Sequence, residues 1–74
     1  MTANVLHTIR TRMDEFSKGQ KRIADYILSR YDKAAFMTAS RLGNITQVSE
    51  STVVRFAAQL GYDGYPAMQK ALQE

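Results

Sequence analysis

The chain contains no cysteine and no tryptophan, and it has one proline and one histidine among its 74 residues. Without cysteine, neither a disulfide nor a thiolate metal site can form. The single histidine, His7, lies among polar neighbours, and no glycine-rich phosphate loop or evident carboxylate pair accompanies it. We therefore predict that His7 is an exposed helical residue, that the chain is not an enzyme, and that it binds no metal or cofactor.

Long apolar runs are also missing. None approaches the roughly 18 residues that a membrane-spanning helix requires. The N-terminal stretch MTANVLHTIRTRMDE lacks the basic segment and apolar core of a secretory signal. We expect a soluble cytoplasmic domain with no membrane partner. Because no run alternates apolar and polar residues between turn signals, no β-strand is predicted either.

The chain carries a modest excess of positive charge. Ten Lys and Arg residues face seven Asp and Glu, which gives a net charge of +3 and a pI near 9.5. This balance suits an anionic partner such as nucleic acid, although many domains are equally basic. A chain of this length supports one small core. We predict a single domain, residues 1–74, with an all-α fold: a small bundle of about five helices.

The first predicted helix covers Ala3 to about Met13. The second is preceded by a capping box, in which Ser17 and Gln20 bond to each other's backbone N–H groups. Beyond the cap, apolar residues recur at steps of three and four, so they should share one face that packs on the core. These residues are Ile23, Ala24, Ile27, Leu28 and Tyr31.

Charged residues of the second helix fall off that apolar face. They are Lys18, Lys21, Arg22, Asp25 and Arg30. A solvated helix surface is the simplest interpretation of such a set. The alternative is that Lys18, Lys21 or Arg22 touches a nucleic-acid phosphate, and the sequence leaves both possibilities open.

Capping residues divide the next part of the chain into short segments. Asp32 should cap a short turn over residues 33–37. Thr38 should cap a third helix over residues 39–45, and Thr46-Gln47-Val48 should break it. The residues expected to pack inward from these segments are Phe36, Met37, Leu42 and Ile45.

Two further helices complete the chain. Ser49 should cap a fourth helix, Glu50 to Leu60, which Gly61 should end in the left-handed conformation. Pro66 suits the first turn of a final helix, where its missing N–H costs nothing. That helix should run to about Gln73 and bury Met68 together with Leu72 or Ala71.

The third and fourth helices have the spacing of a helix-turn-helix, in which the second helix enters the major groove and the first braces it across the backbone. The second helix of such a motif needs one buried face and one face with hydrogen-bond donors. The predicted buried face follows the spacing i, i+3, i+4, i+7 and consists of Val53, Phe56, Ala57 and Leu60. The polar residues off it are Ser51, Thr52, Arg55 and Gln59.

These polar residues suit contacts with DNA. Ser51 and Thr52 lie in the first turn, the deepest part of a recognition helix, and their hydroxyls can bond to a base edge or a phosphate. Arg55 is one turn further, and its guanidinium can reach a guanine edge. The starts of both helices add backbone N–H groups suited to phosphates. We predict a DNA interface composed of Thr38, Ser40, Gln47, Ser49, Ser51, Thr52, Arg55, Gln59 and Tyr65, with Tyr65 at a phosphate.

Helical periodicity alone does not require this function, because every surface helix has a polar side. The alternative is a helical protein–protein interaction module that binds no nucleic acid. Such a module favours an exposed apolar groove and responds little to salt. DNA binding through several phosphates weakens steeply as salt rises, so a salt titration separates the two.

Three segments resemble RpiR-type transcriptional regulators. QKRIADYIL (residues 20–28) is similar to the family's "IAdyIl" helix, VSESTVVRF (48–56) to its "VSe-TVvRF" recognition segment, and LGYDGY (60–65) to its "lGy-Gf" turn. They occur in the family's order and span nearly the whole chain. The resemblance implies an N-terminal helix-turn-helix domain that binds double-stranded DNA within a transcriptional regulator.

The resemblance also implies features outside these residues. In such regulators a C-terminal sugar-isomerase-like domain senses a sugar phosphate and helps the protein to oligomerise. We therefore expect the chain to be a fragment, with that domain beyond residue 74. A sugar-phosphate effector is expected only at that domain, and the full-length protein is expected to be a homodimer.

Two positions depart from the family pattern. Where the bracing helix usually reads "eLA", this chain has Arg41-Leu42-Gly43. Glycine costs up to about 1 kcal/mol inside a helix, but it keeps the small size that lets two helices approach. Where the turn often has glycine, this chain has Gln47. A positive φ there would cost roughly 1 kcal/mol or more, unless the turn is built differently.

Overall fold

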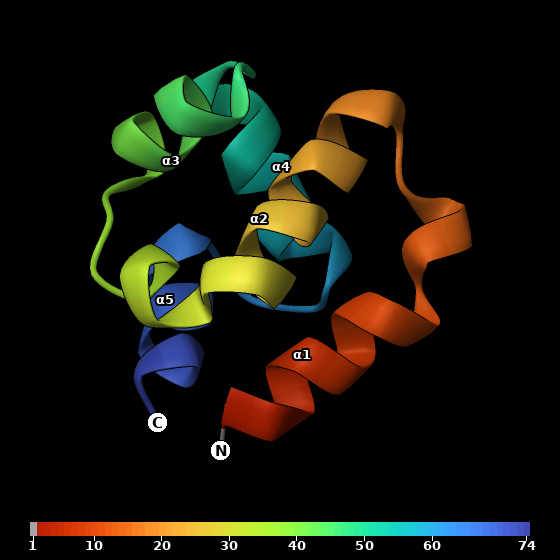
Figure 1. The fold of residues 1–74 in the computed structure, drawn as a ribbon, viewed down its shortest axis with the longest axis vertical. Helices are drawn as coiled ribbons and strands as arrows, with labels where there is room; N and C mark the ends of the chain where they lie inside the picture. Colours follow the sequence, from red (N-terminus) through yellow and green to blue (C-terminus); the bar gives the residue numbers. More distant parts are fainter. Residues whose placement is uncertain (1) are drawn as a thin grey trace.

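Helices account for every regular element in the computed structural model, which describes residues 2–74 (Figure 1). The elements are α1 (Thr2–Thr11), the 3-10 helix η1 (Met13–Glu15), α2 (Lys18–Ala34), α3 (Ala39–Thr46), α4 (Glu50–Gln59) and α5 (Tyr65–Gln73). The predicted all-α fold with five helices is confirmed. None of the helices in this range combines the length and the apolar character needed to cross a bilayer.

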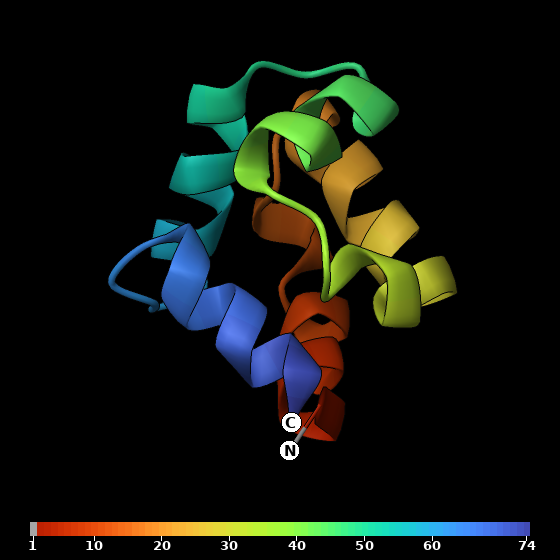
Figure 2. The ribbon, with the colours of Figure 1, turned by 90° about the vertical axis from the view of Figure 1, so that its left-hand side faces the viewer.

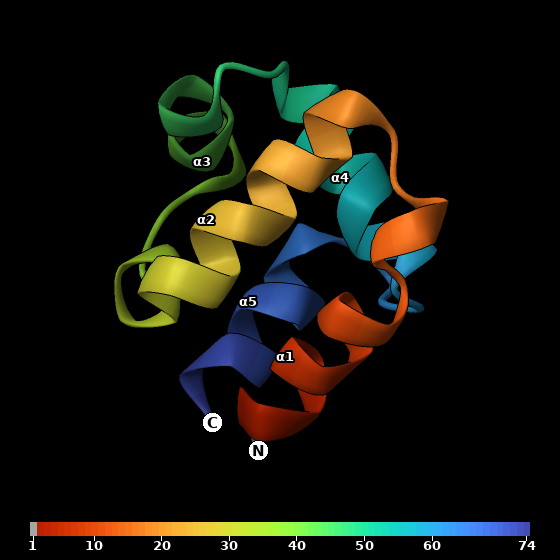
Figure 3. The ribbon, with the colours of Figure 1, turned by 45° about the vertical axis from the view of Figure 1, so that its right-hand side comes forward.

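α2 runs through the middle of the bundle and packs against each of the other four helices (Figure 3). α3 also packs on α4, and α1 packs on α5. The α3–α4 turn lies at one end of the molecule, and the start of α1 and the end of α5 meet at the opposite end (Figures 1 and 2). The turn is therefore free of the rest of the bundle on its outer side.

The core is built from the apolar faces of all five helices. Phe56 of α4 is fully buried, and its ring lies 5.0 Å from that of Phe16, centroid to centroid, at an angle of 50°. Tilted pairs of this kind are favoured by the charge distribution of aromatic rings. Val53, Ala57 and Leu60 are buried with Phe56, so the predicted inner face of the fourth helix is confirmed.

Local signals place most helix boundaries correctly. Ser17 Oγ accepts from the Gln20 N–H at 3.2 Å, and Gln20 Oε1 accepts from the Ser17 N–H at 2.9 Å, which completes the predicted capping box. Gly61 follows α4 with φ 99°, and Pro66 stands in the first turn of α5. α1 ends at Thr11, two residues before the predicted end, because the chain there tightens into η1.

The prediction that Tyr31 and Phe36 pack inward is wrong: Tyr31 is 44% exposed and Phe36 is 77% exposed. Instead of ending before a separate turn capped by Asp32, α2 continues to Ala34 and leaves helical geometry at Arg30, where φ is −140° and ψ is 50°. This kink changes the phase of the helix. Ala34 and Ala35 consequently take the inward positions.

The prediction for Ile45 is also wrong, since its side chain is 45% exposed. α3 extends to Thr46, and Thr46 occupies the buried position one residue further along. Its hydroxyl donates to the Leu42 carbonyl at 2.7 Å. A threonine can be buried at low cost when its hydroxyl bonds to the preceding turn in this way.

Candidate nucleic-acid interface

The turn between α3 and α4 is centred on Gln47, which has left-handed geometry with φ 62° and ψ 40°. The Gln47 N–H donates to the Asn44 carbonyl at 3.3 Å, and the Val48 N–H donates to the Gly43 carbonyl at 2.9 Å. These bonds satisfy carbonyls at the end of α3 and reverse the chain into α4. Gln47 therefore adopts the positive φ that the sequence left open, and its side chain is exposed.

Replacing Gln47 by glycine is expected to raise the free energy of unfolding by up to about 1 kcal/mol. The change removes the steric cost of a side chain at positive φ, partly offset by the greater freedom of glycine in the unfolded chain. Urea denaturation measures the difference. Gln47→Ala is the matched control, because it loses the same amide but keeps a Cβ. Equal stability of the two variants would contradict strain at this position.

Gly43 sets how closely α3 approaches the start of α4. A Cβ added to Gly43 would lie 2.8 Å from the Val48 carbonyl oxygen and 3.4 Å from the Glu50 nitrogen. A Cβ carbon is essentially never found that close to a backbone oxygen, so even alanine requires the backbone to move. The small size expected of this position is thus required by a backbone contact across the turn.

Three hydroxyl groups gather at the start of α4. Ser49 Oγ accepts from the Thr52 N–H at 3.2 Å, which is the predicted cap. It also lies 3.0 Å from Ser51 Oγ and 2.8 Å from Thr52 Oγ1. Ser49 and Ser51 are exposed, and Thr52 is half-buried. Because hydroxyl hydrogens rotate, this cluster can present either a donor or an acceptor to a base edge or a phosphate.

Arg55 lies beyond this cluster on the outer face of α4. Its side chain is exposed, and with Ser51 and Val54 it borders a shallow depression on the helix surface. Among the described residues, its guanidinium is held by no hydrogen bond or ion pair. All its donors are therefore available to an external partner. Val54, which is 41% exposed beside it, offers an apolar contact.

The start of α3 belongs to the same surface as the outer face of α4. Thr38 Oγ1 accepts from the Arg41 N–H at 3.1 Å and caps α3 as predicted. Thr38 and Val54 line one open hollow of about 450 Å³, which is also lined by residues at the start of α5. Thr38 and Ser40 are exposed. The beginning of the bracing helix and the polar face of α4 therefore lie on one side of the molecule.

Two predicted contact residues are engaged inside the protein. Gln59 Nε2 donates to the Glu15 carbonyl at 3.1 Å, and Gln59 Oε1 accepts from Gln20 Nε2 at 2.9 Å. The ring of Tyr65 lines the hollow beside Thr38, but the residue is only 5% exposed and its hydroxyl donates to the Met37 carbonyl at 2.6 Å. The geometry gives both side chains a role in holding α4 and α5 in place.

Burial raises the pKa of Tyr65 from 10.0 to about 12. The neutral phenol is therefore favoured by the fold. The stability that the neutral phenol contributes is present below pH 10 and is lost as the pH rises towards 12.

We expect the free energy of unfolding to fall more steeply over this interval in the wild type than in Tyr65→Phe. That variant should itself lose about 1 kcal/mol at neutral pH with its hydrogen bond. Urea titrations at neutral pH and near pH 11 compare the two, and parallel losses would assign the alkaline transition to other groups.

The sequence matches the family model described as the helix-turn-helix domain of the rpiR family over residues 3–74. It is 42% identical over 71 residues to YfhH, an uncharacterized HTH-type transcriptional regulator of Escherichia coli K12. It is 34% identical over 71 residues to the HTH-type transcriptional regulator HexR of Pseudomonas aeruginosa. Each match covers 96% of this chain and 25% of the relative.

A solved structure shares the fold closely. The Vibrio vulnificus NanR protein, solved in complex with ManNAc-6P, superimposes with a TM-score of 0.89 at 40% sequence identity. The superposition covers 93% of this chain and 26% of that one. The present chain thus spans about a quarter of the length of the proteins it matches.

Proposed function

This chain belongs to the rpiR family of helix-turn-helix domains, and we propose that it binds double-stranded DNA with α4 in the major groove and α3 across the backbone. The domain is of the DNA-binding kind that transcriptional regulators carry. The observation that carries the proposed orientation is the shared outer surface of α3 and α4. Thr38 and Val54 line one hollow there, while Val53 and Phe56 anchor the opposite face of α4 in the core.

Each polar residue of this surface has a proposed role. Ser51, Thr52 and Arg55 read base edges, because they lie on the first turns of α4, where Ser51 and Arg55 are exposed and Thr52 is half-buried. The residues at the helix starts and in the turn bind phosphates; they are Thr38, Ser40, Gln47 and Ser49. Gln59 and Tyr65 position α4 and α5 through their internal hydrogen bonds.

The protein that carries this domain is proposed to act as a cytoplasmic homodimer. Two copies would read half-sites about 34 Å apart, or a multiple of that distance, along one face of the duplex. NanR was solved with ManNAc-6P, a sugar phosphate, which supports a sugar-phosphate effector for the longer protein. Such an effector would bind outside residues 1–74.

Selection of bound sites from random duplexes tests the proposal directly. Two copies of the chain joined through a dimeric coiled coil should enrich paired half-sites. Affinity for the selected duplex should then fall steeply with salt, with a logarithmic slope of about −0.9 for each phosphate contacted. A pool without enrichment, together with binding that salt does not affect, would instead favour a protein-interaction module.

A further inference from the structure

The first turn of α2 lies against the helix-turn-helix motif. A Cβ added to Gly19 would be 3.2 Å from Val48 Cγ1 in the turn and 3.9 Å from Thr52 Cγ2 in α4. The absence of a side chain at Gly19 therefore lets the start of α2 approach both segments. Side chains on this side of α2 are carried next to the motif, although α2 is not part of it.

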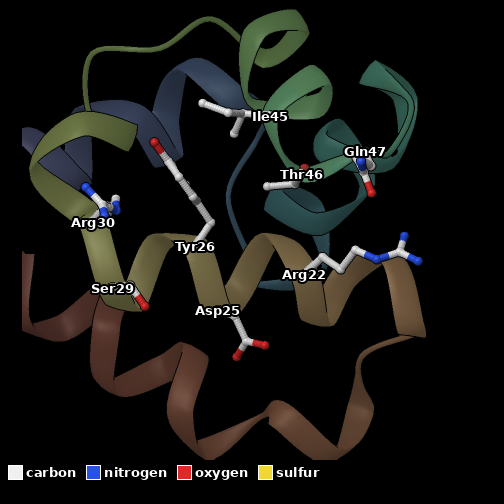
Figure 4. A pocket seen from close by; sticks show the side chains of 8 residues that line it. All are labelled: Arg22, Asp25, Tyr26, Ser29, Arg30, Ile45, Thr46 and Gln47. Atoms are coloured by element: carbon white, nitrogen blue, oxygen red, sulfur yellow. The ribbon is translucent and has the colours of Figure 1, made fainter.

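Arg22 is on this side of α2, three residues beyond Gly19. Together with Thr46 and Gln47 it lines a hollow of about 450 Å³ between α2 and the end of α3. Figure 4 shows the guanidinium extending on the side of Gln47, whereas Asp25, the one carboxylate of this lining, points away from α3. The positive charge beside the turn is therefore not neutralised within the hollow.

Lys18 lies one turn before Arg22, so the two cations follow one line along the helix surface. Both are exposed, and in the described part of the chain neither side chain takes part in a hydrogen bond or an ion pair. Like charges at this spacing slightly destabilise a helix. The pair therefore does not stabilise the fold, but its two positive charges can bind an anion beside the turn.

We propose that Arg22 and Lys18 bind a DNA phosphate beside the α3–α4 turn, and the proposal rests on the DNA-binding function proposed above. The eight residues of α3 span about 12 Å, which is close to the width of the major groove, about 12 Å. Thr38 immediately precedes α3, and Gln47 follows its end. Phosphate contacts near both ends can therefore engage the backbone on the two sides of the groove and fix the angle at which α4 enters it.

The test compares two double variants that each remove two positive charges. Lys18→Ala/Arg22→Ala removes the proposed site. Lys21→Ala/Arg10→Ala is the matched control, because both residues are exposed cations and neither lines the hollow that Arg22 borders. Fluorescence anisotropy at a series of salt concentrations gives the affinity for a selected duplex and for a scrambled duplex of the same length. Thermal unfolding by circular dichroism verifies that each variant is folded.

The site pair should weaken binding to both duplexes by a similar factor and reduce the salt slope by about 1 for the phosphate released. The control pair should change the slope much less, and Arg22→Lys should keep most of it, because a point charge suffices for a phosphate. Equal slopes for the two pairs would overturn the site. So would a loss confined to the selected duplex, since that would indicate base reading.

Failure of this site is distinguishable from failure of the proposed function. If the wild type binds and Arg55→Ala loses selectivity, while the site pair behaves like the control, only the phosphate site is refuted. If the wild type binds neither duplex at low salt, the DNA-binding function and the phosphate site are refuted together.

Discussion

Replacing Phe56 by alanine is expected to lower the free energy of unfolding by about 3–5 kcal/mol. The ring is fully buried and contacts Phe16 at 5.0 Å, so the change removes apolar burial and leaves a cavity. A domain of this size is stabilised by only about 4–11 kcal/mol in total. The variant should therefore be largely unfolded under conditions in which the wild type is stable, as measured by urea denaturation followed by circular dichroism.

The neighbouring residue supplies the control for this prediction. Arg55→Ala alters an exposed side chain one position away and should change stability by no more than about 0.5 kcal/mol. Phe56→Leu keeps most of the buried volume and should fall between the two. If Phe56→Ala were as stable as Arg55→Ala, Phe56 would not be the core anchor of α4.

Arg55→Ala should instead act on DNA recognition. Loss of a bidentate contact to a base costs about 1–3 kcal/mol, or roughly 5- to 150-fold in affinity for a selected duplex. A scrambled duplex should lose far less. Arg10→Ala removes the same charge from the exposed surface of α1 and controls for long-range electrostatics. Equal weakening on both duplexes would reassign Arg55 to a phosphate, and unchanged binding would remove it from the interface.

Helix starts could be predicted from the sequence because caps are local. The side chains of Ser17, Thr38 and Ser49 each bond to a backbone N–H three residues ahead, so the few residues around each cap contain the information. The two faces of α4 were likewise predictable, since a helix places residues 100° apart whatever surrounds it. Adjacent Arg55 and Phe56 could thus be assigned to opposite environments.

Contacts distant in sequence could not be predicted in this way. Gln59 belongs by spacing to the polar side of α4, but its partners Gln20 and Glu15 lie 39 and 44 residues away. No glycine or proline near Arg30 indicates the kink in the sequence, so Tyr31 and Phe36 were predicted to lie on the wrong face. The approach of Gly19 to Val48 likewise depends on how α2 packs. Without that contact, the sequence could not show that Arg22, and not Lys21, lies beside the α3–α4 turn.

The close contact between Gly43 and the Val48 carbonyl affects how related domains can differ in the position of α4. α3 and α4 are held at their present spacing by a backbone approach that a methyl group would block, at 2.8 Å from the Val48 oxygen. A chain with alanine at this position must seat its recognition helix differently. Two domains with identical outward residues on α4 need not prefer the same DNA half-site. A buried Cβ at position 43 would shift α4, and with it the side chains proposed to contact the bases.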